Sequence, residues 1–269
     1  MAHHFAKAGF NSHAYASTRP TYPQQLYETI LGFIRQAGGQ TRLAIDVGCG
    51  NGQVTTRLAH GFDDVIGIDA SQSQLDHAAA HPRVKYHVGA AESLPASDGS
   101  VDLVTAAQAA HWFDLPAFFR ECRRVLRPTG VVAVWTYENA YFDNPDASAH
   151  FSAFFHSLPW DWRRIELVDK RYTTIPFDQH FDTVKRHEFT LKRETDIETL
   201  RAYISTWSAV HECNDREAGR GDALCDAVYE KVRKAMGVKT GETDGFKFML
   251  YHRCTLVLLA DAKKMHEGP

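Results

Sequence analysis

Short apolar runs alternate with longer segments of helical spacing through the first half of the chain. Apolar residues recur on one face between Tyr22 and about Gln36, which predicts a helix that the pair Gly38-Gly39 ends. From there to Tyr137, strand-like runs and helix-like segments take turns. This alternation favours a mostly parallel sheet with helices on both of its faces. The expected strands span residues 42–47, 64–69, 83–88, 101–106 and 131–136, and the expected helices span 52–60, 71–80 and 114–126.

The alternation stops after Tyr137. Residues 138–182 are rich in aromatic residues, proline and aspartate without a regular period, and they are expected to form an inserted lid. Two more strands, near 186–192 and 246–259, and helices near 195–210 and 218–236 follow. The prediction is one α/β domain with a doubly wound sheet of seven strands. Its parts are an N-terminal arm over 1–24, a cofactor-binding core over 40–137, the lid over 138–182, and a C-terminal part over 183–269 that completes the sheet.

The overall composition narrows the choice of partners and location. The 269 residues carry a formal net charge of −3 without any run of lysine or arginine, so no strong field for nucleic acid is expected. The five cysteines are scattered and form no C-x-x-C pair, which fits a reducing cytoplasm. No segment has the pattern of a signal peptide or a membrane span, and the longest apolar run is only Thr255–Ala260. A cytoplasmic protein that binds neither membrane nor nucleic acid is expected.

The segment Asp46–Gly52, with the sequence DVGCGNG, directly follows an apolar strand and precedes a helical segment. Its three glycines allow a tight turn with positive φ and a close approach of the backbone to a ligand. The helix that follows offers free N–H groups at its start. Asp69 ends the next strand, and a carboxylate about 20 residues beyond such a turn is suited to bind ribose hydroxyls. The pattern predicts a nucleoside site.

The spacing of the glycines separates two kinds of nucleoside ligand. Dinucleotide sites use G-x-G-x-x-G, whereas Gly48, Gly50 and Gly52 give G-x-G-x-G. Asp46 precedes them, and a carboxylate there would repel a diphosphate but suits an amino group or a sulfonium. S-adenosylmethionine carries both of these groups and no phosphate. A nicotinamide-dependent oxidoreductase and a non-catalytic S-adenosylmethionine-binding module remain as the alternatives.

Four sequence blocks, in order, carry a family resemblance: Asp46–Gly52, Asp69–Ser71, Gly89–Pro95 and Val125–Gly130. In these blocks the chain resembles the class I S-adenosylmethionine-dependent methyltransferases, over about residues 10–137. A narrower resemblance, to small-molecule methyltransferases of the trans-aconitate type, rests on residues 15–23 and 108–114. The resemblance implies a Rossmann-like fold, S-adenosyl-L-methionine as cofactor and a small-molecule methyl acceptor.

The same resemblance implies roles for individual residues. Asp69 would hold the ribose, with Ala91 and Glu92 at the adenine, and Gln108 would lie with the glycines at the methionine part. Arg19 is a candidate to bind a carboxylate of the cofactor or of the substrate. The candidate cofactor-binding residues are Tyr15, Arg19, Asp46, Gly48, Cys49, Gly50, Asp69, Ala70, Leu75, Ala91, Glu92 and Gln108.

Candidates for the acceptor side include several aromatic residues. Tyr22, Trp112 and Trp135 are the candidate substrate residues, and an aromatic face can attract a sulfonium by about 0.5–2 kcal/mol. His111 is the candidate catalytic residue, either as a general base or as a scaffold that binds the acceptor. Cys49 has no recognisable base beside it and is treated as a packing residue. The lid residues that are candidates to shape the acceptor pocket, most of them expected to pack, are Trp160, Trp162, Arg163, Arg164 and Tyr172.

The predicted reaction is an in-line displacement that moves a methyl group from sulfur to the acceptor atom. Alignment of the reacting atoms can lower the activation free energy by about 7–11 kcal/mol. A carboxylic acid is one candidate acceptor and needs no base, whereas a polyketide, quinone or amine is the alternative. No metal site is expected, since His77 and His81 have helical spacing but no third ligand in view. The protein is expected to be a monomer or a homodimer.

Overall fold

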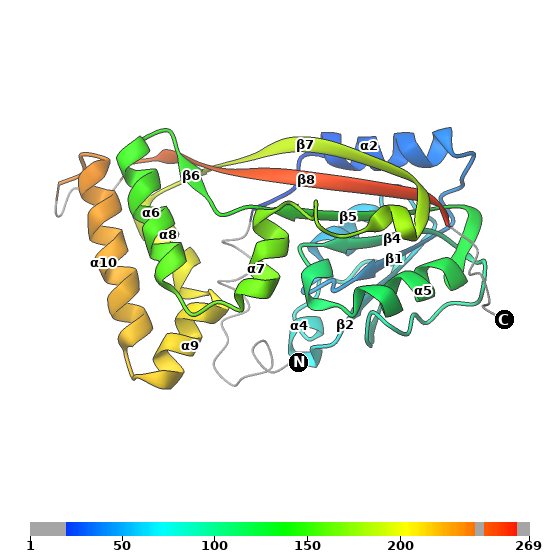
Figure 1. Cartoon of the computed structure of the whole chain (residues 1–269), viewed down its shortest axis with the longest axis horizontal. Helices are drawn as coiled ribbons and strands as arrows, with labels where there is room; N and C mark the ends of the chain where they lie inside the picture. The colour runs from blue at the N-terminus through cyan, green and yellow to red at the C-terminus, as the bar shows by residue number, and fades with distance from the viewer. Residues whose placement is uncertain (1–19, 240–244, 263–269) are drawn as a thin grey trace.

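The computed structural model describes residues 20–239 and 245–262, so the predictions for Tyr15 and Arg19 lie outside the described residues. A wound α/β core occupies one end of the molecule and a group of helices the other (Figure 1). Two long strands, β7 (Phe181–Thr195) and β8 (Phe248–Ala262), run between the two ends. Among the described residues, none of the helices combines the length and apolarity needed to cross a bilayer.

Five parallel strands form the core of the described sheet, as the alternation in the sequence predicts. They lie in the order β3-β2-β1-β4-β5, with Ala44 opposite Val65 on one side and Leu103 on the other. The strand order reverses between β1 and β4, and sheets of this kind bind ligands outside the carboxyl ends of the strands at that point. The strands are β1 (Leu43–Val47), β2 (Asp64–Asp69), β3 (Val84–Val88), β4 (Val101–Ala107) and β5 (Leu126–Tyr137).

The other edge of the sheet contains one strand more than predicted. β8 is antiparallel to β5 and to β7. A two-residue strand, β6 (Tyr141–Phe142), also pairs with β8, at Leu250 and Tyr251. Since β7 takes the opposite edge of β8 at these two residues, β6 continues the line of β5. The described sheet therefore has eight strands rather than the seven predicted, because a strand of two residues gives no periodic signal.

Helices cover both faces of the sheet, and the two faces bury different residues. α2 (Gln24–Gln36) lies on one face and α5 (Leu115–Val125) on the other (Figure 1). Leu26 of α2 belongs to a buried cluster that also contains Trp135 of β5. Phe118 of α5 belongs to a second buried cluster, which contains Tyr172 from the segment that follows α7 (Trp162–Asp169). The period-two alternation of the strands separates these two cores.

Helix α4 (Gln72–Leu75) is shorter than the predicted helix over 71–80. The chain turns away after Leu75, and the N–H of Ala79 donates to the carbonyl oxygen of Asn51 at 3.2 Å instead of continuing the helix. Asn51 belongs to the glycine-rich turn that precedes α3 (Gln53–Leu58). Because α4 ends early, this hydrogen bond joins the glycine-rich turn to the segment that follows α4.

The predicted lid contains regular helices, and these lie in two different parts of the molecule. α6 packs on α10 in the helical group, whereas α7 packs on the short helix η1 (Ala110–Trp112) of the core. The predicted helix over 195–210 is two helices, α8 and α9, separated at Trp207, whose ring stacks on Phe154 of α6 at 5.8 Å. The helices are α6 (Pro145–Ser157), α7 (Trp162–Asp169), α8 (Ile197–Ser205), α9 (Ser208–Arg216) and α10 (Arg220–Ala235).

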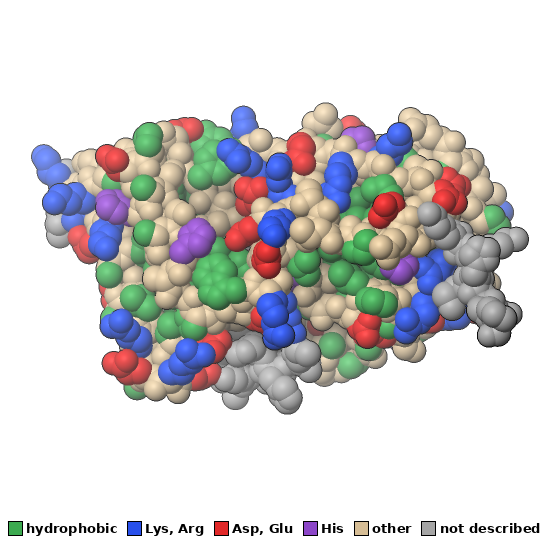
Figure 2. Space-filling view, in the orientation of Figure 1, with side chains coloured by type: hydrophobic (Ala, Val, Ile, Leu, Met, Phe, Trp, Pro, Cys, Tyr) green, Lys and Arg blue, Asp and Glu red, His purple; other side chains and the backbone are tan. Residues whose placement is uncertain are grey.

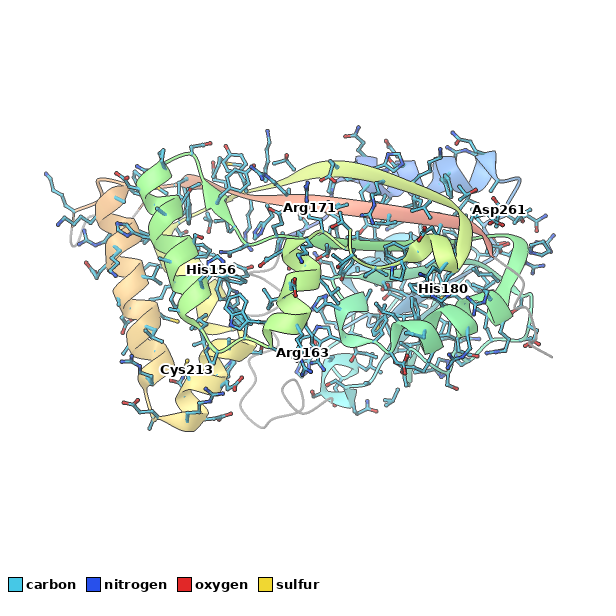
Figure 3. The ribbon with its side chains drawn as sticks, in the orientation of Figure 1. His156, Arg163, Arg171, His180, Cys213 and Asp261 are labelled. Carbon is cyan, nitrogen blue, oxygen red and sulfur yellow. The ribbon has the colours of Figure 1, made fainter. Side chains whose placement is uncertain are left out.

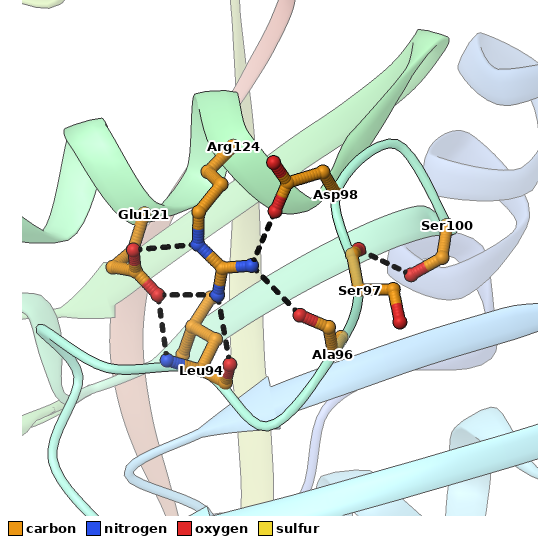
Figure 4. Close-up of polar contacts among 7 residues, drawn as sticks. All are labelled: Leu94, Ala96, Ser97, Asp98, Ser100, Glu121 and Arg124. Carbon is orange, nitrogen blue, oxygen red and sulfur yellow. Dashed lines mark hydrogen bonds and ion pairs between the residues drawn. The ribbon is translucent and has the colours of Figure 1, made fainter.

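One arginine fastens the loop after β3 to α5 (Figure 4). The guanidinium of Arg124 donates to the carbonyl oxygens of Leu94 at 2.9 Å and Ala96 at 2.8 Å, and to the carboxylate of Asp98 at 2.8 Å. It also donates twice to the carboxylate of Glu121, at 2.8 and 2.7 Å, and that carboxylate accepts a third bond from the N–H of Leu94 at 2.8 Å. This loop begins with residues predicted to face the adenine, so the cluster helps to fix that side of the site.

The charged side chains on the face shown in Figure 2 are of both signs and intermixed. That face has no continuous basic stripe of the kind that follows a nucleic-acid backbone. In the part of the chain that the structure describes, no group of three or more histidine, cysteine, aspartate or glutamate residues is arranged to hold a metal ion.

Candidate active site

The glycine-rich turn sits at the carboxyl end of β1, beside the reversal of strand order. Gly48, Gly50 and Gly52 all have positive φ, of 68°, 55° and 81°. A Cβ at Gly48 would lie 2.6 Å from the Cβ of Ala109, and a Cβ at Gly52 would lie 2.0 Å from the hydroxyl of Tyr86. At Gly50 the nearest described atom would be 3.9 Å away. Packing thus requires two of the glycines, whereas Gly50 leaves space for a ligand to approach the backbone.

Asp69 joins this turn to the end of β2. One carboxylate oxygen accepts from the N–H of Gly50 at 2.8 Å, and the other accepts from the N–H of Ser71 at 2.9 Å. Burial raises the pKa of Asp69, although its side chain is still partly exposed. A carboxylate has about four acceptor positions, so two remain for ligand hydroxyls. This geometry suits the predicted contact with a ribose.

Asp46 lies beneath the turn, and the prediction that it faces the ligand is corrected. Its carboxylate is buried and accepts from the hydroxyls of Thr55 and Thr105, each at 2.7 Å. Burial raises its pKa to about 6, and the two threonine hydroxyls oppose that shift. Asp46 therefore supports the turn by joining β1 to α3 and β4. The sequence gives no signal for these partners, because Thr105 is 59 residues away.

Cys49 is also buried, and its N–H donates to the carbonyl oxygen of Ile68 at 3.0 Å. Burial, together with the charge of Asp46, raises the pKa of the Cys49 thiol. A thiol in this state is a poor nucleophile. The structure gives Cys49 a packing role in the turn.

Ala91 and Glu92, predicted at the adenine, follow β3, and the cofactor-binding candidates Ala70 and Leu75 follow β2. Ala91 is buried in the core, and Glu92 is half-buried with one oxygen accepting from the N–H of Asp114 at 2.9 Å. Ala70 is exposed and directly follows β2, and Leu75 is half-buried and ends α4. Ala70 and Leu75 thus lie in the segment that follows Asp69, whereas Glu92 ties its loop to the start of α5.

The side chain of Gln108, predicted at the methionine part, binds the end of β5. Its amide oxygen accepts from the hydroxyl of Thr136 and the N–H of Tyr137, both at 2.8 Å. Its amide nitrogen donates to the carbonyl oxygen of Tyr137 at 3.2 Å. Gln108 also has a positive φ of 52°, a conformation that non-glycine residues hold only where the surroundings fix it. Gln108 therefore sets the turn that leads from β4 into η1.

Of the three candidate substrate residues, Tyr22 and Trp135 pack against each other, and Trp112 belongs to η1. Trp135 is fully buried beside α2, and its ring meets the ring of Tyr22 edge-on at 5.4 Å. Trp135 is a core residue, so its prediction as a substrate residue is wrong. The alternation within β5 points Trp135 to the α2 face, and the sequence alone does not reveal which face is covered. Trp112, in contrast, is 38% exposed and lies on η1.

His111 and Trp112 of η1 contact α7 and the turn that follows it. Nδ1 of His111 lies 2.9 Å from the hydroxyl of Tyr172, and both side chains are buried. The guanidinium of Arg164 lies 4.4 Å from the centre of the Trp112 ring. Burial, and then the charge of Arg164, lower the pKa of His111 to about 3. His111 is thus neutral near pH 7, and it lies beside α7 and the turn after it, which carry the lid candidates Arg164 and Tyr172.

The strand order, the glycine-rich turn and Asp69 together define an α/β enzyme that binds an adenosyl ligand at the carboxyl ends of its strands. Comparison with known proteins gives the family. Residues 45–134 match the methyltransferase domain family. A protein of Dictyostelium discoideum that carries a methyltransferase name is 35% identical over 242 residues, covering 88% of this chain and 89% of its own length. The chain belongs to the class I S-adenosylmethionine-dependent methyltransferases, and S-adenosylmethionine is its cofactor.

Two further relatives agree with this assignment. An uncharacterized methyltransferase of Mycobacterium tuberculosis is 39% identical over 205 residues, covering 72% of this chain and 75% of its own. A solved structure named as a type II methyltransferase from Anaeromyxobacter dehalogenans superposes with a TM-score of 0.70 at 28% identity, covering 90% of this chain and 97% of its own. The predicted class, fold and cofactor are therefore confirmed.

Proposed function

We propose that this methyltransferase acts on a small molecule bound between η1 and α7, and that the acceptor group is a carboxylate. In this proposal Asp69 holds the ribose, the open backbone at Gly50 receives the methionine part, and Ala70, Leu75 and Ala91 surround the adenine. His111 and Trp112 form the acceptor side. The space at Gly50 and the free acceptor positions of Asp69 support the fit of the cofactor.

The burial of His111 against Tyr172, which lowers the pKa of its imidazole, is the observation that carries the acceptor class. With a pKa of about 3, the imidazole would remove a proton from a phenol or an amine poorly at neutral pH. A carboxylate arrives already ionised and needs no base. The guanidinium of Arg164 lies above the Trp112 ring and close enough to affect His111, and although it also pairs with Asp161 at 3.4 Å, its positive charge favours an anion at this place.

The protein contributes to the reaction mainly by aligning the acceptor with the methyl group. S-adenosylmethionine supplies a methyl group already activated on a sulfonium. One acceptor oxygen forms the new C–O bond as the C–S bond breaks, the bonding pair stays on sulfur, and no proton moves. The protein's part is to hold the acceptor in line, and such orientation is worth about 7–11 kcal/mol in favourable cases. His111 then orients the acceptor through a hydrogen bond.

A labelled-methyl assay tests the proposal. The purified protein is incubated with methyl-labelled S-adenosylmethionine and matched panels of carboxylic acids, phenols and amines, and the products are identified by mass spectrometry. We expect methyl esters, formed together with an equal amount of S-adenosylhomocysteine. Methylated phenols or amines without esters would refute the acceptor class.

The variant His111→Ala separates orientation from base catalysis. If His111 only orients a carboxylate, the variant should retain kcat within about tenfold and lose mainly in the KM for the acceptor, as expected for a lost hydrogen bond to a charged group. The measurement is steady-state kinetics at saturating S-adenosylmethionine. A fall in kcat of several orders of magnitude at saturating acceptor would instead give His111 the role of a base.

A further inference from the structure

Tyr172 makes a buried polar contact between the two sides of the proposed acceptor site. It follows α7 in the chain, whereas His111 lies in η1, 61 residues earlier. Its side chain is completely buried, and its hydroxyl lies 2.9 Å from Nδ1 of His111 and also hydrogen-bonds with Thr136 of β5. A buried hydroxyl is unfavourable unless it is hydrogen-bonded, so the imidazole and Thr136 together make a tyrosine acceptable here.

The backbone that carries Tyr172 has an unusual conformation. Arg171 and Tyr172 have positive φ values of 52° and 57°, and neither is a glycine. Two consecutive left-handed residues cost free energy and persist only where the surrounding structure fixes them. The guanidinium of Arg186 on β7 does so by donating to the carbonyl oxygens of Arg171 at 3.1 Å and Tyr172 at 2.9 Å. Strained residues of this kind collect at functional sites.

Ion pairs hold the same turn from its other side. The guanidinium of Arg171 lies 3.3 Å from the carboxylate of Glu138, directly after β5, and 3.6 Å from that of Glu188 on β7. Figure 3 labels Arg163 and Arg171 at the two ends of α7, between the core and the helical group. The end of α7 is thus tied to two strands of the sheet. These ties keep the hydroxyl of Tyr172 against the imidazole of His111.

We infer that Tyr172 is a positioning residue for the methyl transfer, because its bond to Nδ1 fixes the ring of His111 so that Nε2 is presented to the acceptor. The bond on one ring nitrogen selects the orientation and tautomer of the other. The position of α7 against η1 thereby determines the orientation of the His111 ring toward the acceptor. This inference rests on the proposed function, since it requires the acceptor to lie beside His111.

The test is a double-mutant cycle with Tyr172→Phe, His111→Ala and the double variant. Tyr172→Phe should lower kcat/KM for the acceptor about tenfold, which corresponds to one hydrogen bond, and should leave the affinity for S-adenosylmethionine unchanged. In the His111→Ala background, the same substitution should cost nothing further, because Tyr172 acts only through His111. The control is Tyr229→Phe, which removes a hydroxyl that donates to Glu198 at 2.7 Å in the helical group and should keep wild-type kinetics.

The outcomes separate this inference from the proposed function. A further loss of about tenfold in the double variant, or wild-type kcat/KM in Tyr172→Phe, overturns the positioning role while leaving the acceptor site in place. Wild-type kinetics in His111→Ala overturns both. Nitrogen NMR of the unaltered protein gives an independent check that needs no folded variant. Distinct signals for a hydrogen-bonded Nδ1 and for Nε2 in one tautomer support the inference, and averaged signals from exchanging tautomers refute it.

Discussion

Replacing Asp46 by asparagine should remove a pH-dependent loss of stability. The carboxylate is buried, and burial raises its pKa from 3.8 to about 6. The folded protein therefore binds this proton more tightly than the unfolded chain does, and ionisation opposes folding. The stabilisation is fully present below about pH 4 and is lost as the pH rises through about 6. A shift of about two units corresponds to about 3 kcal/mol in the free energy of unfolding.

Urea unfolding of the wild type and Asp46→Asn between about pH 4 and 7.5 measures this contribution. The difference between the two proteins should change by about 3 kcal/mol over that range in favour of the variant, because asparagine does not ionise. Asparagine also has one oxygen where aspartate has two, so one of the hydroxyls of Thr55 and Thr105 loses its acceptor. That loss is constant with pH and does not affect the trend. Asp64→Asn, at the exposed start of β2, is the matched control. A difference that stays flat across the range would refute the reasoning.

Two further predictions concern the cofactor turn. Asp69→Ala should weaken S-adenosylmethionine binding by at least about tenfold in calorimetry, since charge-assisted bonds to the ribose are lost. Asp64→Ala should keep wild-type affinity, and equal affinities of these two variants would remove Asp69 from the site. Gly52→Ala should lower the melting temperature by more than Gly99→Ala does. Both glycines have positive φ, of 81° and 60°, but only at Gly52 would a Cβ meet a neighbour, the hydroxyl of Tyr86 at 2.0 Å, within 4 Å. Equal losses would mean that Tyr86 moves aside at little cost.

Features carried by neighbouring residues in the chain could be predicted from the sequence. The glycine-rich turn, Asp69 and the parallel strands of the core depend on local spacing, and local spacing is what the sequence displays. The positive φ at Gly48, Gly50 and Gly52 follows from the same pattern. The sequence blocks that carry the family resemblance lie in this part of the chain, and the match to the methyltransferase domain family also lies there, over residues 45–134.

Features that depend on distant partners could not be predicted. Asp46 was expected at the ligand, because nothing in the sequence reveals that Thr55 and Thr105 would enclose its carboxylate. Gln108 was expected at the methionine part, but its amide binds the end of β5. Tyr172 was expected mainly to pack, because its hydroxyl finds a partner only when the end of α7 folds back onto η1. In each case the side chain contacts a residue whose separation along the sequence follows no regular pattern.

The contacts between residues near in sequence and those between distant residues also belong to different parts of the proposed site. The bonds that build the cofactor turn, such as that from Gly50 to Asp69, lie within residues 45–134, which match the shared domain family. On the acceptor side, His111 and Trp112 lie in that matched region, but Tyr172 and Arg164, which contact them, lie outside it. In the proposed site, the common core therefore holds the methyl donor, and the side that would face the acceptor comes partly from α7 and the turn after it, outside the matched domain. If the proposal holds, we expect changes in α7 to alter the choice of acceptor without disturbing the glycine-rich turn.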